Sequence, residues 1–179
     1  ALALRLEPKI AALIPQMVIM GGSTDFGNFS PAAEFNILAD PHAASIVFSS
    51  GVPIVMFGLN VTHQVLATPA RVDKFRQLGS KVAEVVVSLL EFFKLSYEKR
   101  YQFAGPALHD PCTVAYLLRP DLFTLREMNV EIELGVGPSF GQTVCDVWSV
   151  TGKVKNARVA IEADADGFFE LLLERVGRY

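Results

Sequence analysis

A glycine-interrupted loop after a short apolar run is the feature that most constrains the fold of this chain. Residues 16–20 read Gln-Met-Val-Ile-Met, which is typical of a buried β-strand. Gly21, Gly22 and Gly27 then break the apolar pattern, so the chain leaves the strand through a loop. Open α/β sheets place their ligand sites in loops that follow buried strands. The sequence therefore predicts a ligand site just beyond residue 20.

Polar side chains lie among apolar neighbours in this loop, and they suit a ligand rich in hydroxyl groups. Asn28, Glu34 and Asn36 are backed by aromatic residues that include Phe35. A carboxylate accepts hydrogen bonds from hydroxyls, and an amide both donates and accepts. A sugar is therefore the obvious candidate ligand. A polar loop that ends in a helix cap is the alternative, and this stretch alone favours neither.

Apolar runs, capping residues and turn residues alternate along the 179 residues in the order typical of an α/β protein. The expected helices are 1–13 divided at Pro8, 41–50 after Asp40, 69–78 after Thr68, 81–102 after Ser80, 111–118 after Asp110 and 168–176 after Asp166. The expected strands are 16–20, 53–59, 128–134, 142–148 and 157–162. This order predicts a single domain over 1–179 with an open, mainly parallel, twisted sheet flanked by helices and a late antiparallel hairpin.

The expected helix over 81–102 changes character along its length. Its first half is largely apolar and its second half is polar, which predicts a buried stem with a wetter end. Phe93, Tyr97 and Tyr101 recur at helical spacing, so one face carries three aromatic rings. Core packing or an interface stripe is the simplest interpretation of that pattern taken alone.

Composition excludes several classes of partner. The net charge of -3 and the isoelectric point near 5.6 argue against nucleic acid and anionic membranes. The apolar runs are interrupted by charged or turn residues, so no transmembrane segment is expected. Cys112 and Cys145 are too few for a disulfide framework, which favours reduced thiols and a cytoplasmic location.

Motifs in three parts of the chain resemble those of one enzyme family. They are Met20-Gly-Gly, Gly27-Asn28, Pro31-x-Ala-Glu34-Phe-Asn36, Asp40-Pro41-x-Ala-Ala44, His109-Asp110-Pro111 and, more weakly, Gly137-Pro138 with Gly141-x-Thr143-Val144-x-Asp146. Their order and separation resemble the calcium-dependent nucleoside hydrolases, the inosine–uridine nucleoside N-ribohydrolases, across nearly the whole chain. The phrase His109-Asp-Pro-Cys-Thr113 is most similar to the pyrimidine-preferring branch.

This resemblance implies hydrolysis of the N-glycosidic bond of ribonucleosides, chiefly uridine and cytidine, to free base and ribose. It implies that Asn36 binds the ribose 2′ and 3′ hydroxyls, that Glu34 and Met20 bind the 5′ end, and that Asn28 binds the ribose edge. Phe35 belongs to the same substrate-binding set. The positive charge that develops on the sugar makes a nearby carboxylate favourable.

The resemblance also assigns the remaining chemistry. It implies that Asp110 is a Ca²⁺ ligand beside an activated water and that His109 protonates the departing base. Histidine has an ordinary pKa of about 6.5, which suits a proton donor near neutral pH. Tyr97 and Tyr101 are expected at the base, and Phe93 is expected to pack. Without the resemblance, Asp110 is simply a helix N-cap and His109 a structural histidine.

One departure from the family pattern is large. The family's aspartate-rich motif Asp-x-Asp-Pro-Gly-x-Asp-Asp is absent, although calcium takes roughly 6–8 oxygen ligands. The chain therefore resembles the C-terminal portion of a longer enzyme, and we expect a missing N-terminal aspartate-rich segment or a companion chain. Members of the family are usually dimers or tetramers, so the resemblance implies a homo-oligomer. A catalytically inactive nucleoside- or sugar-binding protein of the same fold is the alternative function.

Other candidates carry less weight. His42 is expected at the surface, His63 in a structural position, and Cys112 as a packing residue rather than a nucleophile. The glycines between 135 and 141 have the wrong spacing for a dinucleotide-binding fingerprint and precede no helix. A nicotinamide-dependent dehydrogenase is therefore not expected.

Overall fold

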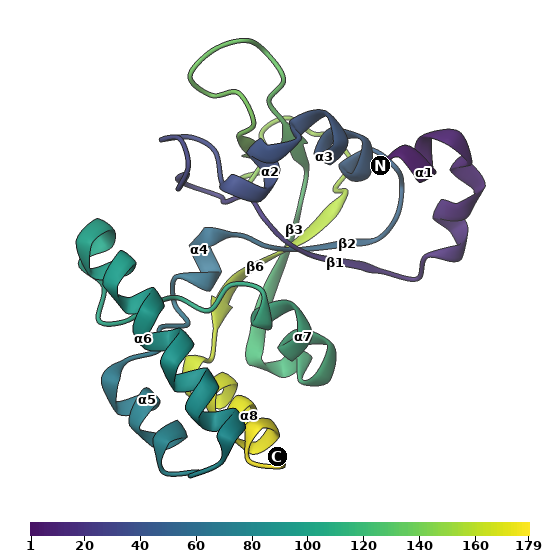
Figure 1. The fold of residues 1–179 in the computed structure, drawn as a ribbon. Helices are drawn as coiled ribbons and strands as arrows, with labels where there is room; N and C mark the ends of the chain where they lie inside the picture. Colours follow the sequence, from purple (N-terminus) through teal and green to yellow (C-terminus); the bar gives the residue numbers. More distant parts are fainter. The chain divides into compact units, whose positions relative to one another are not determined.

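The computed structural model describes all 179 residues except the side chain of Glu98. The chain forms two compact units, each built from two separate stretches of sequence. Unit 1 comprises Ala1–Val61 and Thr124–Glu162, and unit 2 comprises Thr62–Phe123 and Ala163–Tyr179. The elements of each unit can be followed in Figure 1. The expectation of a single domain over the whole chain stays a prediction.

Most expected elements form, with shorter bounds. The α-helices are α1 (Leu2–Leu6), α2 (Phe35–Ala39), α3 (Pro41–Phe48), α4 (Leu59–Thr62), α5 (Pro69–Arg76), α6 (Lys81–Tyr101), α7 (Pro111–Leu118) and α8 (Ala165–Val176). The 3₁₀ helices are η1 (Pro8–Leu13) and η2 (Pro120–Leu122). The strands are β1 (Met17–Met20), β2 (Ile54–Phe57), β3 (Phe123–Met128), β4 (Val130–Ile132), β5 (Thr143–Cys145) and β6 (Ala157–Ala163).

The main sheet has the strand order β1-β2-β6-β3 (Figure 1). β1 and β2 pair in parallel, with Met17 opposite Ile54 and Met20 opposite Phe57. β2 and β6 are also parallel. Every residue of β2 is buried, because both faces of a parallel sheet are covered. The predicted α/β class with a mainly parallel sheet is confirmed.

The predicted hairpin forms, but part of its neighbourhood differs from expectation. β4 and β5 pair antiparallel, with Val130 opposite Cys145 and Ile132 opposite Thr143. The preceding strand β3 was not predicted. Its sequence, Phe-Thr-Leu-Arg-Glu-Met, places Arg126 next to Glu127 and so lacks the apolar alternation that indicates a strand.

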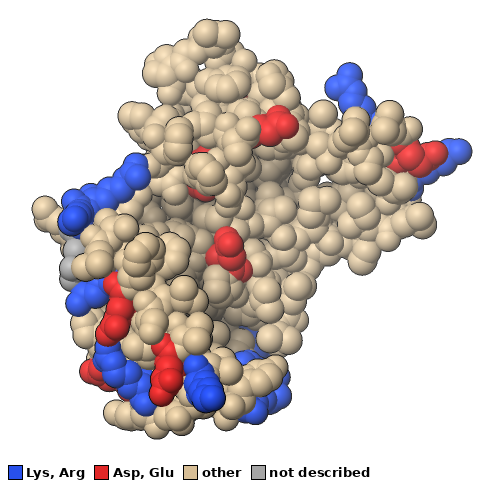
Figure 2. Space-filling view, viewed as in Figure 1, with Lys and Arg blue, Asp and Glu red and all other residues tan. Residues whose placement is uncertain are grey.

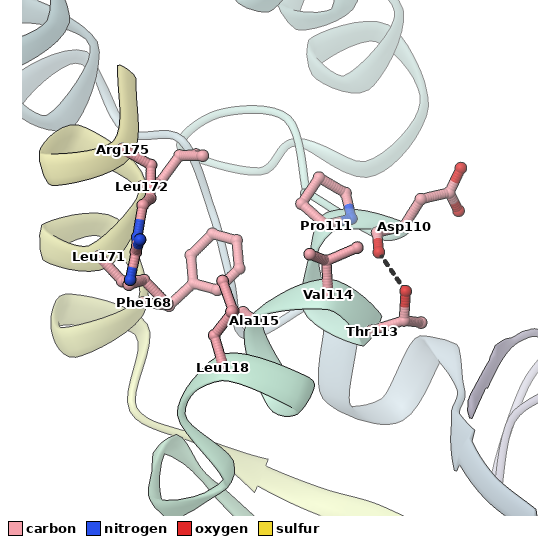
Figure 3. A pocket seen from close by; sticks show the side chains of 10 residues that line it. All are labelled: Asp110, Pro111, Thr113, Val114, Ala115, Leu118, Phe168, Leu171, Leu172 and Arg175. Carbon is pink, nitrogen blue, oxygen red and sulfur yellow. Dashed lines mark hydrogen bonds between the residues drawn. The ribbon is translucent and has the colours of Figure 1, made fainter. Parts of the chain in front are cut away.

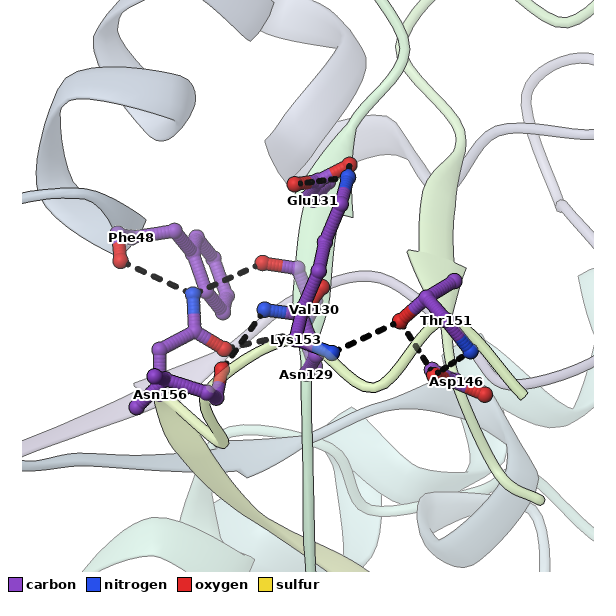
Figure 4. A network of polar contacts seen from close by, with 9 residues as sticks. Phe48, Asn129, Val130, Glu131, Asp146, Thr151, Lys153 and Asn156 are labelled. Carbon is purple, nitrogen blue, oxygen red and sulfur yellow. Dashed lines mark hydrogen bonds and ion pairs between the residues drawn. The ribbon is translucent and has the colours of Figure 1, made fainter. Parts of the chain in front are cut away.

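A network of polar contacts ties the segment after β5 to the hairpin (Figure 4). The amide of Asn156 donates to the backbone oxygens of Phe48 (3.0 Å) and Val130 (2.8 Å), and its oxygen accepts from the Val130 N–H (2.8 Å). The Asp146 carboxylate accepts from the Thr151 N–H at 2.9 Å and from its hydroxyl at 2.5 Å. These bonds hold the pKa of Asp146 below its ordinary value. Asp146, the last residue of the weakest motif, therefore organises a loop.

Helices α5, α6, α7 and α8 make up most of unit 2, with α5 packing on α6 and α8. Ser80 caps α6 as predicted, because its hydroxyl accepts from the Ala83 N–H at 3.2 Å. The predicted cap of α8 is wrong. Asp164 accepts from the Gly167 N–H at 3.0 Å, whereas Asp166 lies inside the helix and pairs with Arg71 at 2.6 Å.

Helix α6 is not the buried stem that its sequence suggested. Val85, Leu89 and Phe92 are 59%, 54% and 70% exposed. Only a narrow stripe of its apolar residues is buried, namely Ala83, Val87 and Leu90. A mostly apolar sequence therefore produced a helix with one covered face and one open face. None of the helices in the described part of the chain is long and apolar enough to cross a membrane.

Surface charge on the face shown in Figure 2 is mixed in sign. Lysine and arginine side chains lie beside aspartate and glutamate side chains over α5, α6 and α8. Ion pairs of the described residues include Arg76 with Glu91 and Arg178 with Glu174. Exposed pairs of this kind add little stability.

Gly27 gives a test of how tightly the loop after β1 is folded. A Cβ atom at this position would lie 2.2 Å from the Ser30 oxygen and 2.4 Å from the Ala33 nitrogen. Gly27→Ala should therefore lower the free energy of unfolding by about 1–3 kcal/mol, measured by urea denaturation. Gly137→Ala is the matched control because nothing lies within 4 Å of its Cβ. Equal stability of the two variants would contradict the loop geometry.

Candidate active site

The loop of unit 1 is closed by the carboxylate of Glu34. Glu34 is only 3% exposed, and its Oε2 accepts from the N–H groups of Gly22 (3.0 Å) and Ile37 (3.2 Å). Its Oε1 accepts from the Asn36 N–H at 2.8 Å. Glu34 is thus the N-cap of α2, a helix that the sequence analysis missed. The helix cap considered as the alternative is present, and a ribose-binding role for Glu34 stays a prediction.

The other expected ribose residues gather around this cap. The Asn36 amide donates to the backbone oxygen of Met20 at 3.3 Å and to its sulfur at 3.2 Å. The Asn28 oxygen accepts from the Phe35 N–H at 2.8 Å. The rings of Phe29 and Phe35 lie 5.6 Å apart. Unit 1 therefore brings together all five predicted substrate-binding residues from the loop and the end of β1.

Thr143 supports the loop from the hairpin. Its hydroxyl accepts from the Ser23 N–H at 2.9 Å and donates to the Ser23 oxygen at 2.6 Å. Gly22 has a φ of +71°, and a Cβ there would lie 2.5 Å from the Thr143 methyl carbon. Glycine at position 22 is needed for this close approach. The sequence pointed to Thr143 only as part of a motif and gave no sign of this contact.

In unit 2, His109 lies between two hydroxyl groups. Its Nδ1 is 2.7 Å from the Thr62 Oγ1, and its Nε2 is in hydrogen-bond contact with the Tyr97 hydroxyl. The rings of Tyr97 and Tyr101 lie 5.3 Å apart. Unit 2 therefore brings together His109, Tyr97 and Tyr101, as predicted. Thr62 was missed because 47 residues separate it from its partner.

Further rings complete an aromatic cluster around His63. Its ring lies 5.5 Å from Tyr101, 5.1 Å from Phe103 and 5.6 Å from His109. The structural placement expected for His63 thus puts it against His109. Phe93 was expected to pack, but it is 53% exposed and lines an open pocket. His42 is exposed, as expected, and its ring lies 6.2 Å from that of Phe140.

Burial sets the protonation of this cluster. It lowers the pKa of His109 from its ordinary 6.5 to about 4. Burial, followed by the neighbouring His109, lowers the pKa of His63 to about 4. Burial, followed by Tyr101, raises the pKa of Tyr97 to about 12. His109 is consequently a neutral imidazole at pH 7, and the expectation of an ordinary pKa near 6.5 is corrected.

The carboxylate of Asp110 does not hold the helix that follows it. Asp110 is the N-cap residue of α7 by position, as predicted, but its side chain makes no cap hydrogen bond. Its backbone oxygen accepts from the Thr113 hydroxyl at 2.8 Å, while its side chain is exposed and points away from α8 (Figure 3). In the part of the chain that the structure describes, no group of three or more His, Cys, Asp or Glu residues could hold a metal ion.

Cys112 is a packing residue, as predicted. It is fully buried, and its thiol donates to the Leu108 oxygen at 3.0 Å. Burial raises the pKa of this thiol to about 12, so no nucleophilic thiolate forms at neutral pH.

These features define an α/β protein with a polar loop beyond β1 and a histidine–aspartate pair at the start of α7. The chain belongs to the nucleoside hydrolase family, because the family model for inosine-uridine preferring nucleoside hydrolases matches residues 1–170. The resemblance found from the sequence motifs is therefore confirmed.

Individual relatives agree with this assignment. The pyrimidine-specific ribonucleoside hydrolase RihA of Salmonella paratyphi A (strain ATCC 9150 / SARB42) is 46% identical over 181 positions, covering 100% of this chain and 58% of the relative. The solved purine-preferring ribonucleoside hydrolase from Gardnerella vaginalis is 35% identical with a TM-score of 0.87, covering 98% of this chain and 56% of its own. The plant nucleoside hydrolase PpNRh1 is 30% identical with a TM-score of 0.89, covering 99% and 58%. The chain thus spans less than two thirds of the length of these relatives.

The low pKa of His63 predicts a loss of stability in mild acid. Its pKa is about 4 in the folded protein and about 6.5 in the unfolded chain, so the unfolded chain binds more protons between these values. Its contribution to stability is present above pH 6.5 and is lost as the pH falls towards 4. The melting temperature should therefore fall over this range, and less steeply in His63→Gln. His42→Gln is the control variant. An unchanged pH profile in His63→Gln would exclude this role for His63.

Proposed function

We propose that the protein carrying this chain hydrolyses the N-glycosidic bond of ribonucleosides to free base and ribose. The observation that carries the proposal is the contact of His109 with Tyr97 in a chain of the nucleoside hydrolase family. A preference for pyrimidine nucleosides is proposed because the 46% identical relative is named as pyrimidine-specific. The purine-preferring solved relative is less similar, at 35% identity.

In this proposal the residues around the Glu34 cap bind the ribose. Both side-chain hydrogen bonds of Asn36 use its nitrogen, which fixes the amide orientation and leaves the oxygen to accept from ribose hydroxyls. Asn28 and Met20 bind the ring edge and the 5′ end, with Phe35 forming an exposed apolar wall. The buried negative charge of Glu34 stabilises the positive charge that develops on the sugar as the bond breaks.

The aromatic cluster of unit 2 receives the base. A departing base gains negative charge, which hydrogen-bond donors stabilise. His109 is neutral, so it acts through its hydrogen bond with the Tyr97 hydroxyl rather than by giving up an imidazolium proton. Tyr97 and Tyr101 provide flat faces and hydroxyl donors beside it. Because burial raises the pKa of Tyr97 to about 12, its hydroxyl keeps its proton at pH 7 and remains a donor.

Replacing His109 should affect substrates in proportion to the help that their leaving group needs. His109→Ala should slow uridine hydrolysis by roughly 10²–10⁴-fold. It should largely spare a nitrophenyl riboside, because nitrophenolate departs without protonation. Steady-state kinetics on both substrates measure this, and His42→Ala is the matched histidine control. Equal losses on the two substrates would make His109 a structural residue.

The calcium ion of the family is proposed as a cofactor with Asp110 as one ligand. The described residues alone do not make a calcium site, because Asp110 is a single carboxylate and calcium takes roughly 6–8 oxygen atoms. The remaining ligands are proposed to come from an aspartate-rich segment or a companion chain. When bound, calcium supplies an activated water.

Unit 2 offers a surface suited to such a segment. Two apolar pockets of about 510 and 420 Å³ share the residues Asp110, Pro111 and Leu172. In the larger pocket, Val114 and Leu118 of α7 face the apolar residues of α8 (Figure 3). We propose that the part of the nucleoside hydrolase fold outside this chain covers both pockets and thereby reaches Asp110.

Complementation would test this arrangement. This chain alone should neither bind calcium tightly nor hydrolyse uridine, and both properties should appear with the complementary segment of a relative. Leu118→Asp should weaken that complementation because it places a charge in the apolar pocket. Val136→Asp, at a fully exposed position of unit 1, is the control. Calcium titration calorimetry and uridine turnover measure the outcome, and robust turnover by this chain alone would refute the proposal.

An inactive nucleoside- or sugar-binding protein is the second candidate. The lone carboxylate at Asp110 favours it only if no other segment accompanies the chain. Intact-mass measurement of the purified protein separates the two candidates. The proposal also includes a cytoplasmic location, supported by the free thiols of Cys112 and Cys145, and assembly as a homo-oligomer.

A further inference from the structure

The hydroxyl of Thr62 is a buried polar group that the proposed chemistry does not yet use. Thr62 is 0% exposed, at the end of α4. Its Oγ1 lies 2.7 Å from Nδ1 of His109, on the side of the ring opposite the Tyr97 contact. Among the hydrogen bonds of the described residues, this is the one that the Thr62 hydroxyl makes. The histidine is therefore held at both nitrogens.

Backbone pairing fixes the distance between Thr62 and His109. The Leu108 N–H donates to the Val65 oxygen at 3.0 Å, and the Ala67 N–H donates to the Pro106 oxygen at 2.8 Å. Between them, Leu66 and Ala107 form an antiparallel bridge. The two segments that carry the hydroxyl and the imidazole are thus joined on either side of that bridge. The contact is a property of the local backbone and not of one flexible side chain.

Hydrogen-bond accounting assigns the direction of the contact. A neutral imidazole has one N–H donor and one acceptor nitrogen, and a hydroxyl has one proton to donate. If Nδ1 carried the proton and donated to Thr62, the buried hydroxyl proton would need another acceptor. Buried donors are rarely left without an acceptor. Thr62 therefore donates to Nδ1, and the ring proton lies on Nε2, where it faces the oxygen of Tyr97.

We propose that Thr62 is a positioning residue that fixes His109 in the tautomer with its proton on Nε2. The His109 N–H then donates to the Tyr97 oxygen, so the phenol proton is not used in that contact. Tyr97 is left to donate its O–H to the departing base. With the opposite tautomer, Tyr97 would donate to Nε2 and would present no proton to a substrate. This inference rests on the proposed hydrolase function and adds a role for Thr62 and Tyr97 within it.

Thr62→Val and Thr62→Ser form a matched pair for the kinetic test in the full protein. Valine keeps the shape of threonine and removes the hydroxyl, whereas serine keeps the hydroxyl. Thr62→Val should lower kcat for uridine by about 10–100-fold, as loss of an outer partner of a functional histidine does. It should leave KM nearly unchanged and largely spare the nitrophenyl riboside. Thr62→Ser should restore most of the activity on uridine.

The tautomer is measured directly by nitrogen NMR of the full protein labelled with ¹⁵N-histidine. The His109 signals, assigned by their loss in His109→Gln, should show a pyridine-type Nδ1 and a protonated Nε2. In Thr62→Val the two tautomers should mix. A protonated Nδ1 in the unmodified protein would overturn the proposal, as would full uridine activity in Thr62→Val or equal losses on both substrates.

The kinetic test and the NMR test can fail independently, so together they separate this inference from the proposed function. If the unmodified protein cleaves neither uridine nor the nitrophenyl riboside, the hydrolase function fails. The NMR measurement then still decides whether Thr62 sets the tautomer. If Thr62→Val does not fold, the tautomer of the unmodified protein and the activity of Thr62→Ser still decide the proposal, and an inactive Thr62→Ser would count against it.

Discussion

The carboxylate of Glu34 connects the loop after β1 to the helix that follows it. One oxygen accepts from Gly22 at the start of the loop and from Ile37 in α2, and the other accepts from Asn36. A carboxylate that accepts several backbone N–H groups stabilises both the loop and the positive end of the helix. Asn36 and Met20 owe their positions to this junction. In unit 1, the arrangement of the polar side chains therefore depends on one buried negative charge.

In unit 2, hydroxyl groups rather than a carboxylate position the key side chain, His109. No carboxylate holds His109 in the described contacts; its two nitrogens face the hydroxyls of Thr62 and Tyr97. Gly105 permits the approach of the two backbone segments, because a Cβ there would lie 2.1 Å from the Ala67 oxygen. Neutral partners leave the histidine without a nearby counter-charge, and burial then favours its neutral form. The neutral state of the His109 imidazole therefore follows from its being positioned by hydroxyl groups.

The sequence predicted the features that depend on residues close together in the chain, such as helix caps. Asp40 followed by proline and Ser80 at the start of α6 both became helix caps as expected. Asp110 carries the same signal before Pro111 but makes no cap bond, because its backbone is already helical at φ -59° and ψ -39°. Glutamate is not a preferred N-cap, so the sequence allowed a helix cap in this loop without pointing to Glu34 or to α2.

Contacts between distant residues could not be predicted in the same way. A motif selected His109, and helical spacing together with the family resemblance selected Tyr97 and Tyr101. Thr62 and Phe103 carry no such signal and are recognised only in the folded structure. The exposure of α6 could not be predicted from the sequence either. Its apolar residues surround most of the helix, so periodicity gave no indication of which stripe would be covered.

The order of strands also has a consequence for synthesis on the ribosome. β2 pairs with β1 on one side, but its other partner, β6, begins about 100 residues later, with Ile54 opposite Ala157. At typical translation rates, roughly 5–20 s pass before β6 has been made. During that time one edge of β2, in which every residue is buried in the folded protein, has no native partner. A nascent chain of this protein is therefore a natural client for chaperones that bind extended apolar segments.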